Sequence, residues 1–256
     1  MSTPIIELRN IHYSVSGADG EKRLILDDIS LSIEAGSITC LMGTSGSGKT
    51  TLLRLMAGLI FPESGEVLIE GQDICRLKEA DLNVIRRDMG FVFQYSALFD
   101  SLSVAQNIGF ALDRRRRPQK EIKEVVTRLL QEVGLTGVEN KRPSQLSGGM
   151  KKRVAMARAL AASPKIVLYD EPDSGLDPIM TRVIDELILQ MRAEKHTTNV
   201  VVSHNVASIF RIADRVLMLN AAKIVADGSP AELKNSDEPV VRQFIEGRAE
   251  GPILIQ

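Results

Sequence analysis

The sequence is poor in cysteine, has no long apolar segment and carries almost no net charge over its 256 residues. Its two cysteines, Cys40 and Cys75, form no repeating pattern and are predicted to be free thiols in a reducing compartment. No window approaches the roughly 20 apolar residues that a membrane-spanning helix needs, and residues 1–7 lack the basic start and apolar stretch of a signal peptide. The formal net charge of -1 gives no general attraction to nucleic acid or anionic lipid. We therefore expect no nucleic-acid partner, and membrane contact only through other subunits.

Short apolar or alternating runs that predict strands alternate with helix-period runs over most of the chain. This alternation is typical of an α/β fold in which a mostly parallel sheet is covered on both faces. The predicted strands are 5–8, 24–33, 37–42, 67–69, 89–93, 166–169, 199–202 and 215–219, and the predicted helices are 49–59, 120–133, 150–162, 179–194 and 207–213. The 44% of apolar residues are enough for a sizeable core.

Three segments depart from the alternation and define the organisation of the chain. Residues 5–33, with a polar turn at 16–22, predict a separate antiparallel β layer at the N-terminus. Residues 96–163 carry helical signals only and predict an inserted helical lobe; the arginine run 114–117 within it is better explained as a solvated loop than as a lipid contact. Residues 236–256 predict a short helix and an extended tail that dock on a neighbouring subunit. We expect one domain over residues 1–235 and a docking segment after it.

A phosphate-binding loop is predicted directly after the strand 37–42, and a helix follows it. Its residues are Gly43, Thr44, Ser45, Gly46, Ser47, Gly48, Lys49, Thr50 and Thr51. Small residues allow consecutive backbone N–H groups to turn inward, and the helix N-terminus adds positive potential. Lys49 is expected to reach the β- and γ-phosphates of ATP, and Thr50 to ligate Mg²⁺. The alternative, a merely flexible Gly/Ser loop, is disfavoured by the strand before it and the helix after it.

A second group of chemically active residues ends the apolar strand 166–169. Asp170 and Glu171 follow this strand, at the edge where a parallel α/β sheet binds its ligand. We expect Asp170 to hold Mg²⁺ and Glu171 to orient and polarise the attacking water. A strand ending in two carboxylates is a weak signal alone, but it supplies the acidic half of a nucleotide triphosphatase when the phosphate-binding loop is present.

A further anion-binding helix start is predicted at residues 146–150. Ser147, Gly148 and Gly149 precede a helical stretch, so the hydroxyl and the glycine amides can present a second phosphate cradle. An ordinary serine cap followed by flexible glycines is an equally good explanation of the pentapeptide alone. One chain already has one cradle for a γ-phosphate, so a second cradle requires another use.

These motifs, with Gln94, Asp177 and His204, occur in an order that resembles the ABC ATPases. The phosphate-binding loop, Gln94, residues 146–150, Asp170-Glu171, residues 174–177 and His204 are similar to the Walker A, Q-loop, signature, Walker B, D-loop and H-loop of that family. Alone, Gln94 and His204 fit a turn residue and a cap, and Asp177 also fits the cap of a helix starting at Pro178. The resemblance extends from residue 5 to about residue 233 and implies a RecA-like P-loop core.

The resemblance implies a role for each of these motifs. In the family two ATP-binding subunits pair head to tail, so Ser147, Gly148 and Gly149 would close on ATP held by a second copy of the chain. Gln94 would contact Mg²⁺ or the lytic water, and His204 the γ-phosphate. Asp177, in the D-loop, would belong to the residues that bind the nucleotide. An aromatic residue stacks on adenine in many members. Tyr13 is the candidate here, although it is offset from the usual position, and simple packing within the β layer is the alternative.

Residues 90–108, the run 170–178 and the tail resemble the ATPases of lipid-trafficking ABC systems that work with MCE-domain proteins, in particular the Mla system of Gram-negative bacteria. This implies a peripheral subunit on the cytoplasmic face of the inner membrane, with transmembrane permeases, an MCE protein and a small STAS-type subunit as partners. An amino-acid or other small-solute importer ATPase shares every catalytic motif and stays an alternative. A soluble non-transport ABC ATPase is a third reading, disfavoured because neither a long coiled coil between the phosphate motifs nor a second cassette is present.

Overall fold

The computed structural model describes residues 4–17 and 20–253, and its core is a six-stranded sheet. The strand order is β10-β9-β3-β8-β7-β6, with parallel pairing from β9 to β6 and β10 antiparallel at the edge. The bounds are β3 Ile38–Gly43, β6 Met89–Val92, β7 Ile166–Asp170, β8 Thr198–Val202, β9 Arg215–Asn220 and β10 Lys223–Gly228. Every residue of β3, β7 and β8 is buried, which explains their continuous apolar sequences.

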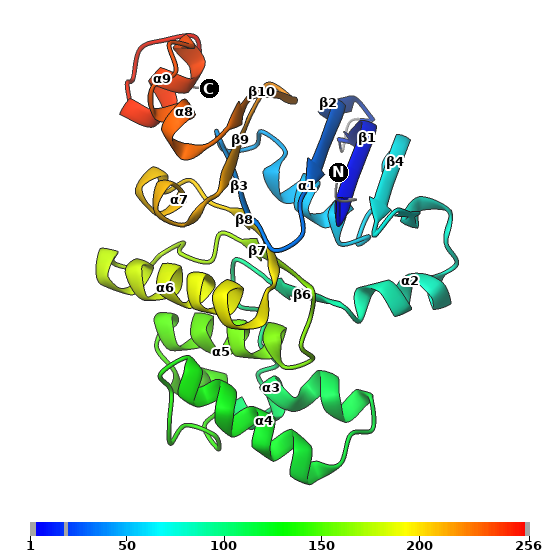
Figure 1. The fold of residues 1–256 in the computed structure, drawn as a ribbon, viewed down its shortest axis with the longest axis vertical. Helices are drawn as coiled ribbons and strands as arrows, with labels where there is room; N and C mark the ends of the chain where they lie inside the picture. The colour runs from blue at the N-terminus through cyan, green and yellow to red at the C-terminus, as the bar shows by residue number, and fades with distance from the viewer. Residues whose placement is uncertain (1–3, 18–19, 254–256) are drawn as a thin grey trace.

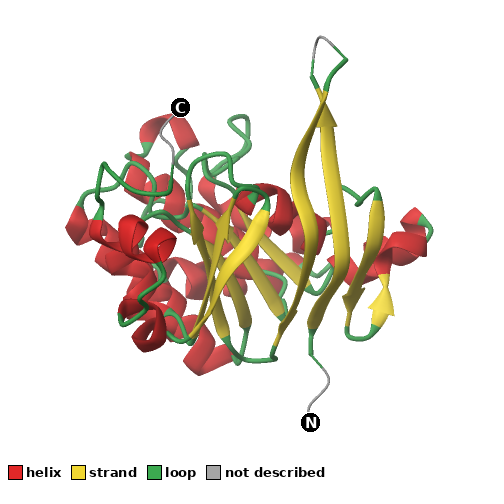
Figure 2. Ribbon diagram, turned by 90° about the horizontal axis from the view of Figure 1, so that it is seen from above, coloured by secondary structure: helices red, strands yellow, loops and turns green. Residues whose placement is uncertain are grey.

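The predicted N-terminal β layer is a four-stranded sheet with the order β2-β1-β4-β5. Its strands are β1 Ile6–Ser16, β2 Lys22–Ile33, β4 Ser64–Ile69 and β5 Gln72–Asp73, all paired antiparallel. Figure 2 shows the two sheets as separate groups of strands, with most helices on the side of the core sheet away from this layer. β1 and β2 pair from Ile6 opposite Ile33 to Ser16 opposite Lys22, with irregularities that account for the poor alternation in the sequence.

Nine helices occur in the described residues, and those of the inserted lobe gather at one end of the molecule (Figure 1). The lobe contains α3 Val104–Arg114, α4 Gln119–Glu132 and α5 Gly148–Leu160. The other helices are α1 Lys49–Met56, α2 Glu79–Arg86, α6 Pro178–Lys195, α7 Val206–Ile212, α8 Pro230–Lys234 and α9 Pro239–Glu246. No helix in the described part of the chain has both the length and the apolarity to cross a membrane.

Alternate residues of the core strands face two different apolar clusters. Leu41 and Leu168 pack with α1 and the β layer, whereas Cys40 and Tyr169 pack with α5, α6, α7 and the lobe. The period of two along a strand places successive side chains on opposite faces. The core sheet is therefore covered on both faces.

The C-terminal segment packs against this chain's own core. α9 contacts α8 and β10, and Val241 is fully buried in an apolar cluster that also contains Ile209 and Ile212 of α7. The side chain of Gln243 then holds the tail, because its Oε1 accepts from the N–H of Ile253 at 2.7 Å and its Nε2 donates to the carbonyl of Ile253 at 3.2 Å. Docking of the helix and tail on another subunit stays a prediction.

Candidate active site

The phosphate-binding loop connects β3 to α1 and needs glycine at two positions. Gly43 has φ 141°, and a Cβ there would lie 2.0 Å from the carbonyl oxygen of Leu219 on the neighbouring strand β9. Gly48 has φ 100°, and a Cβ there would lie 2.9 Å from the carbonyl oxygen of Ile25. Both the left-handed backbone and the close neighbours exclude any larger residue. The loop therefore has its shape fixed by the two sheets on either side of it.

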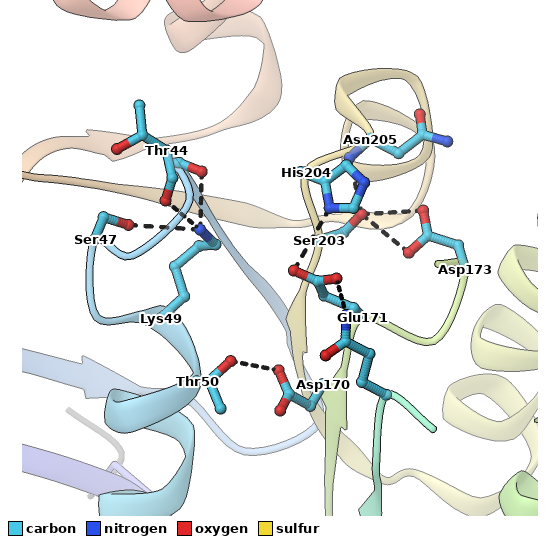
Figure 3. Close-up of polar contacts among 12 residues, drawn as sticks. Thr44, Ser47, Lys49, Thr50, Asp170, Glu171, Asp173, Ser203, His204 and Asn205 are labelled. Atoms are coloured by element: carbon cyan, nitrogen blue, oxygen red, sulfur yellow. Dashed lines mark hydrogen bonds and ion pairs between the residues drawn. The ribbon is translucent and has the colours of Figure 1, made fainter. Parts of the chain in front are cut away.

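Lys49 lies at the centre of this loop, with its ammonium group turned back onto it (Figure 3). Its Nζ donates to the carbonyl oxygens of Gly43 at 2.9 Å and Thr44 at 2.7 Å, and lies 3.5 Å from Oγ of Ser47. The side chain is only 7% exposed, so burial lowers the pKa of Lys49, while the nearby Glu171 and Asp170 act in the opposite direction. A positive charge held by neutral carbonyls in this way is available for an anion entering the loop.

Thr50 and Asp170 meet although 120 residues separate them in sequence. The hydroxyl Oγ1 of Thr50 donates to Oδ1 of Asp170 at 2.8 Å, joining the first turn of α1 to the end of β7. Asp170 is 5% exposed, and this burial raises the pKa of its carboxyl, whereas the hydrogen bond from Thr50 lowers it. The result is a pair of hard oxygen donors beside the loop.

Glu171 is held between Gln94 and His204. The amide Nε2 of Gln94 donates to Oε2 of Glu171 at 2.8 Å, and Nδ1 of His204 lies 3.5 Å from Oε1 (Figure 3). Gln94 follows β6 and His204 follows β8, so the strands on both sides of β7 contribute one residue each. The three predicted catalytic side chains thus converge at one edge of the core sheet.

A cavity of about 380 Å³ lies between the phosphate-binding loop, Gln94 and Glu171. Its lining is Arg23, Ile25, Ser45, Gly46, Ser47, Gly48, Lys49, Thr50, Thr51, Gln94 and Glu171. Thr44 lines an adjoining cavity of about 720 Å³, whose other walls include Arg23 and the tail residues Pro252 and Ile253. The two cavities share Arg23, Ile25 and three residues of the loop, and Pro252 and Ile253 line the second cavity only.

Tyr13 does not line either of these cavities. It lies on β1 opposite Leu26 and packs against the apolar cluster beneath the β layer. The side chains that β2 brings to the loop are Arg23 and Ile25, and Nη2 of Arg23 would be 3.8 Å from a Cβ at Gly46. Nothing in the sequence around Arg23 marks it, because its place depends on the register of two strands. Stacking of Tyr13 on adenine stays a prediction.

The signature residues lie away from this chain's own cavity. Ser147 and Gly148 are exposed, and a Cβ at Gly148 would meet no atom within 4 Å. Ser147 caps α5, since its Oγ accepts from the N–H of Met150 at 3.3 Å. Gly149 faces the start of α6, where a Cβ would lie 3.1 Å from Cε of Met180. The serine cap and an open helix start are therefore present together, and anion binding there stays a prediction.

Two other loops have clear local causes. Asp177 caps α6, because its Oδ1 accepts from the N–H groups of Ile179 and Met180, both at 2.9 Å. Asn205 caps α7 by accepting from the N–H of Ser208 at 3.2 Å. Both loops end in a helix N-terminus, which fixes the direction of the residues just before it.

Sequence reasoning missed three polar residues behind the site. Asp173 is 7% exposed, and the hydroxyl of Ser203, the residue before His204, donates to its carboxylate, with Oγ 3.1 and 3.0 Å from the two carboxylate oxygens. Burial is the main cause that raises the pKa of Asp173. Lys152 on α5 donates to the backbone carbonyl of Glu171 at 3.1 Å. For Asp173 and Lys152 the available signal was a charged residue inside an otherwise apolar part of the sequence. Only the fold shows what each of the three residues contacts.

Comparison with known proteins places these features in context. A family model described as ABC transporter matches residues 26–174. The chain is 39% identical over 254 residues to the intermembrane phospholipid transport system ATP-binding protein MlaF of Haemophilus influenzae, covering 99% of this chain and 94% of that one. It is 43% identical over 230 residues to "Probable ribonucleotide transport ATP-binding protein mkl" of Mycobacterium leprae, covering 90% and 66%. A solved dimeric ATP-binding cassette, MJ0796, in a post-hydrolysis state bound to ADP and Pi, superposes with a TM-score of 0.82 at 32% identity, covering 88% and 98%.

Proposed function

Because the chain belongs to the ABC transporter ATP-binding family, we propose that it binds ATP and Mg²⁺ at the phosphate-binding loop and hydrolyses the ATP to power a membrane transporter. The observation that carries the proposal is the meeting of Lys49, Thr50, Glu171 and Gln94 around one cavity of about 380 Å³, from segments far apart in the chain. Asp170 joins this group through its hydrogen bond with Thr50. Packing of the core does not require charged side chains to converge at the strand ends of the sheet, whereas a ligand site does.

Mg²⁺ fits the donors that are present. It is usually held by one or two protein oxygen ligands together with phosphate oxygens and water, and Thr50 Oγ1 and Asp170 Oδ1 provide such oxygens 2.8 Å apart. Among the residues that the structure describes, no three His, Cys, Asp or Glu side chains form a metal cluster, so a fully protein-ligated ion is not the alternative. When bound with the nucleotide, the ion would neutralise charge on the phosphate oxygens.

The residues around the phosphates then have separate tasks. Lys49, now shared among loop carbonyls, would turn to the β- and γ-phosphates. Glu171 would accept the proton of the attacking water, while Gln94 holds its carboxylate and contacts the water or the ion. His204, which lies 3.5 Å from Glu171, would bind the γ-phosphate and keep the water in line.

A second copy of the chain is the proposed partner for the exposed signature residues. Ser147 and Gly148 face open space and have no phosphate to bind within their own chain. A head-to-tail dimer would bring them onto ATP in the partner's loop, with Asp177 and the 78% exposed Ile179 near the interface. The similarity to a solved dimeric cassette supports this arrangement.

The proposed permease contact is an aromatic groove of about 740 Å³ between the core and the lobe. Phe99 and Phe110 stack in it with centroids 4.7 Å apart, and both are partly exposed. Five arginines line the same groove: Arg86, Arg87, Arg114, Arg115 and Arg158. An amphipathic helix with acidic residues at its edges fits this combination of apolar floor and basic rim. Gln94 lies in the chain between Phe93 and Ala97, which both line this groove, so a movement of Gln94 with nucleotide state would reach the groove.

Phospholipid is the proposed cargo, on the strength of the match to MlaF over 99% of this chain. The match to the relative named for ribonucleotide transport covers 90% of this chain and 66% of that protein, which makes small-solute transport the second candidate. With phospholipid as cargo, the subunit would lie on the cytoplasmic face of the inner membrane with permease, MCE-domain and STAS-type partners. Purifying the complex from its native membrane and identifying co-eluting proteins and lipids separates the two, since a solute-binding protein in place of an MCE protein would refute the lipid proposal.

The hydrolytic role is tested with Glu171→Gln. This variant is expected to keep ATP affinity and lose about 100-fold or more in kcat, because the general base is removed while the phosphate contacts stay. Lys49→Ala is expected to lose ATP binding itself. Glu186→Gln, an exposed carboxylate on α6 paired with Arg182, serves as the matched control with native activity. A native hydrolysis rate in Glu171→Gln would show that the assigned base is wrong.

A further inference from the structure

Lys152 is a buried cation on α5 that does not line the nucleotide cavity. Lys152 is only 8% exposed, and its Nζ donates to the backbone carbonyl oxygen of Glu171 at 3.1 Å. Burial lowers the pKa of Lys152, although the charges of Asp173 and Glu171 oppose the effect. Burying an ammonium group is costly, so its contact with the predicted general base requires a reason.

The backbone of Glu171 supplies that reason. Its φ of 47° lies in the left-handed region, which a long side chain rarely adopts and which persists only when the surroundings enforce it. Its N–H donates to the carbonyl of Val202 at 2.9 Å on the neighbouring strand β8. Its carbonyl accepts from Lys152 Nζ and from the N–H of Ser174 at 3.2 Å. Of the three hydrogen bonds that fix the backbone of Glu171, only the one from Lys152 is made by a side chain.

We propose that Lys152 is a positioning residue for ATP hydrolysis, which holds the strained peptide of Glu171 so that its carboxylate faces the cavity and which couples this geometry to the signature helix. The proposal rests on the proposed role of Glu171 as general base. α5 begins immediately after Ser147, so Lys152 lies about one turn from the residues that would contact the partner's ATP. A shift of α5 on closure of the dimer therefore moves the donor that fixes Glu171.

Three substitutions separate this role from a structural one. Lys152→Met keeps the length and apolar stem but removes the donor, whereas Lys152→Arg keeps a donor and the charge. Lys151→Met alters the adjacent lysine, for which the structure gives no bond to Glu171, and is the matched control. ATP hydrolysis by the full chain, the KM for ATP and the melting temperature are measured for each variant.

Lys152→Met is expected to lose about tenfold or more in kcat with KM unchanged within about twofold, because a small misplacement of the base affects the transition state and not ATP binding. Lys152→Arg should recover a large part of the loss, and Lys151→Met should behave as the native chain. A native kcat in Lys152→Met would overturn the proposal. So would a loss that follows a lowered melting temperature and is equal in Lys152→Arg.

A double-mutant cycle shows whether Lys152 acts through Glu171. In the Glu171→Gln background, Lys152→Met should change the residual rate by less than about twofold and should leave ATP-dependent dimer formation intact in gel filtration. A further tenfold loss, or loss of the dimer, would mean that Lys152 acts elsewhere. A native rate in Glu171→Gln alone refutes the proposed base, whereas a stalled Glu171→Gln with a fully active Lys152→Met refutes only the positioning role.

Discussion

Replacing Arg211 by methionine is expected to lower the free energy of unfolding by about 3 kcal/mol. Asp185 on α6 is 1% exposed and forms an ion pair with Arg211 on α7, and it also accepts from Oγ of Ser208. Removing one partner of a buried pair costs about 3 to 5 kcal/mol because the other charge is left buried. The side chain of Arg211 is 32% exposed, so some water reaches the pair, and the lower end of that range applies.

This loss corresponds to a measurable change in melting temperature. An unfolding entropy of about 2.1 cal/mol/K per residue gives about 0.5 kcal/mol/K for a chain of this length, so 3 kcal/mol lowers the midpoint by about 6 °C. Calorimetry or the far-UV circular dichroism melt of the full chain at neutral pH provides the measurement. Asp177 caps α6, and α7 starts two residues after His204, so the pair also joins the helices that follow two of the predicted functional loops.

Arg182→Met is the matched control, because Arg182 pairs with Glu186 on the exposed face of the same α6. Such a surface pair contributes only about 0.3 to 0.5 kcal/mol. The double variant Asp185→Leu with Arg211→Leu removes both charges and should be more stable than Arg211→Met alone. If Arg211→Met melts no lower than Arg182→Met, the argument from burial is refuted.

Two further predictions concern the site. Burial raises the pKa of Asp173 in the folded chain, so the folded state holds its proton to higher pH, and stability falls as pH rises from the unfolded pKa of about 3.9 through the raised folded value. Asp173→Asn should therefore melt higher than the native chain at pH 7, with an advantage that shrinks toward pH 4; an advantage that grows on acidification would contradict this. Cysteines at Ser45 and Ser147, in a Glu171→Gln chain whose Cys75 is replaced by serine, should cross-link two chains only with ATP, and a cross-link within one chain or without ATP would count against the head-to-tail dimer.

Helices and strands were predictable where periodicity is strong and less so where local chemistry defines them. α3 was not predicted, although Ser103 and Gln106 form a capping box at its start, as Ser229 and Glu232 do for α8. β10 was missed because its burial pattern is intermediate along an edge strand. The signals for α3 and α8 lie in their capping residues more than in a regular spacing of apolar residues. A prediction based on that spacing therefore misses them.

The sequence alone determined the phosphate-binding loop, the strand ending in Asp170 and Glu171, and the family, because each motif is a contiguous run whose function depends on its own backbone. The tertiary structure decided which of them meet: Thr50 with Asp170 across 120 residues, and Gln94 with Glu171 across 77. It also brought Arg23 rather than Tyr13 to the loop and placed Val241 in the core. Such contacts follow from sheet order, strand register and packing, which no local run of residues contains.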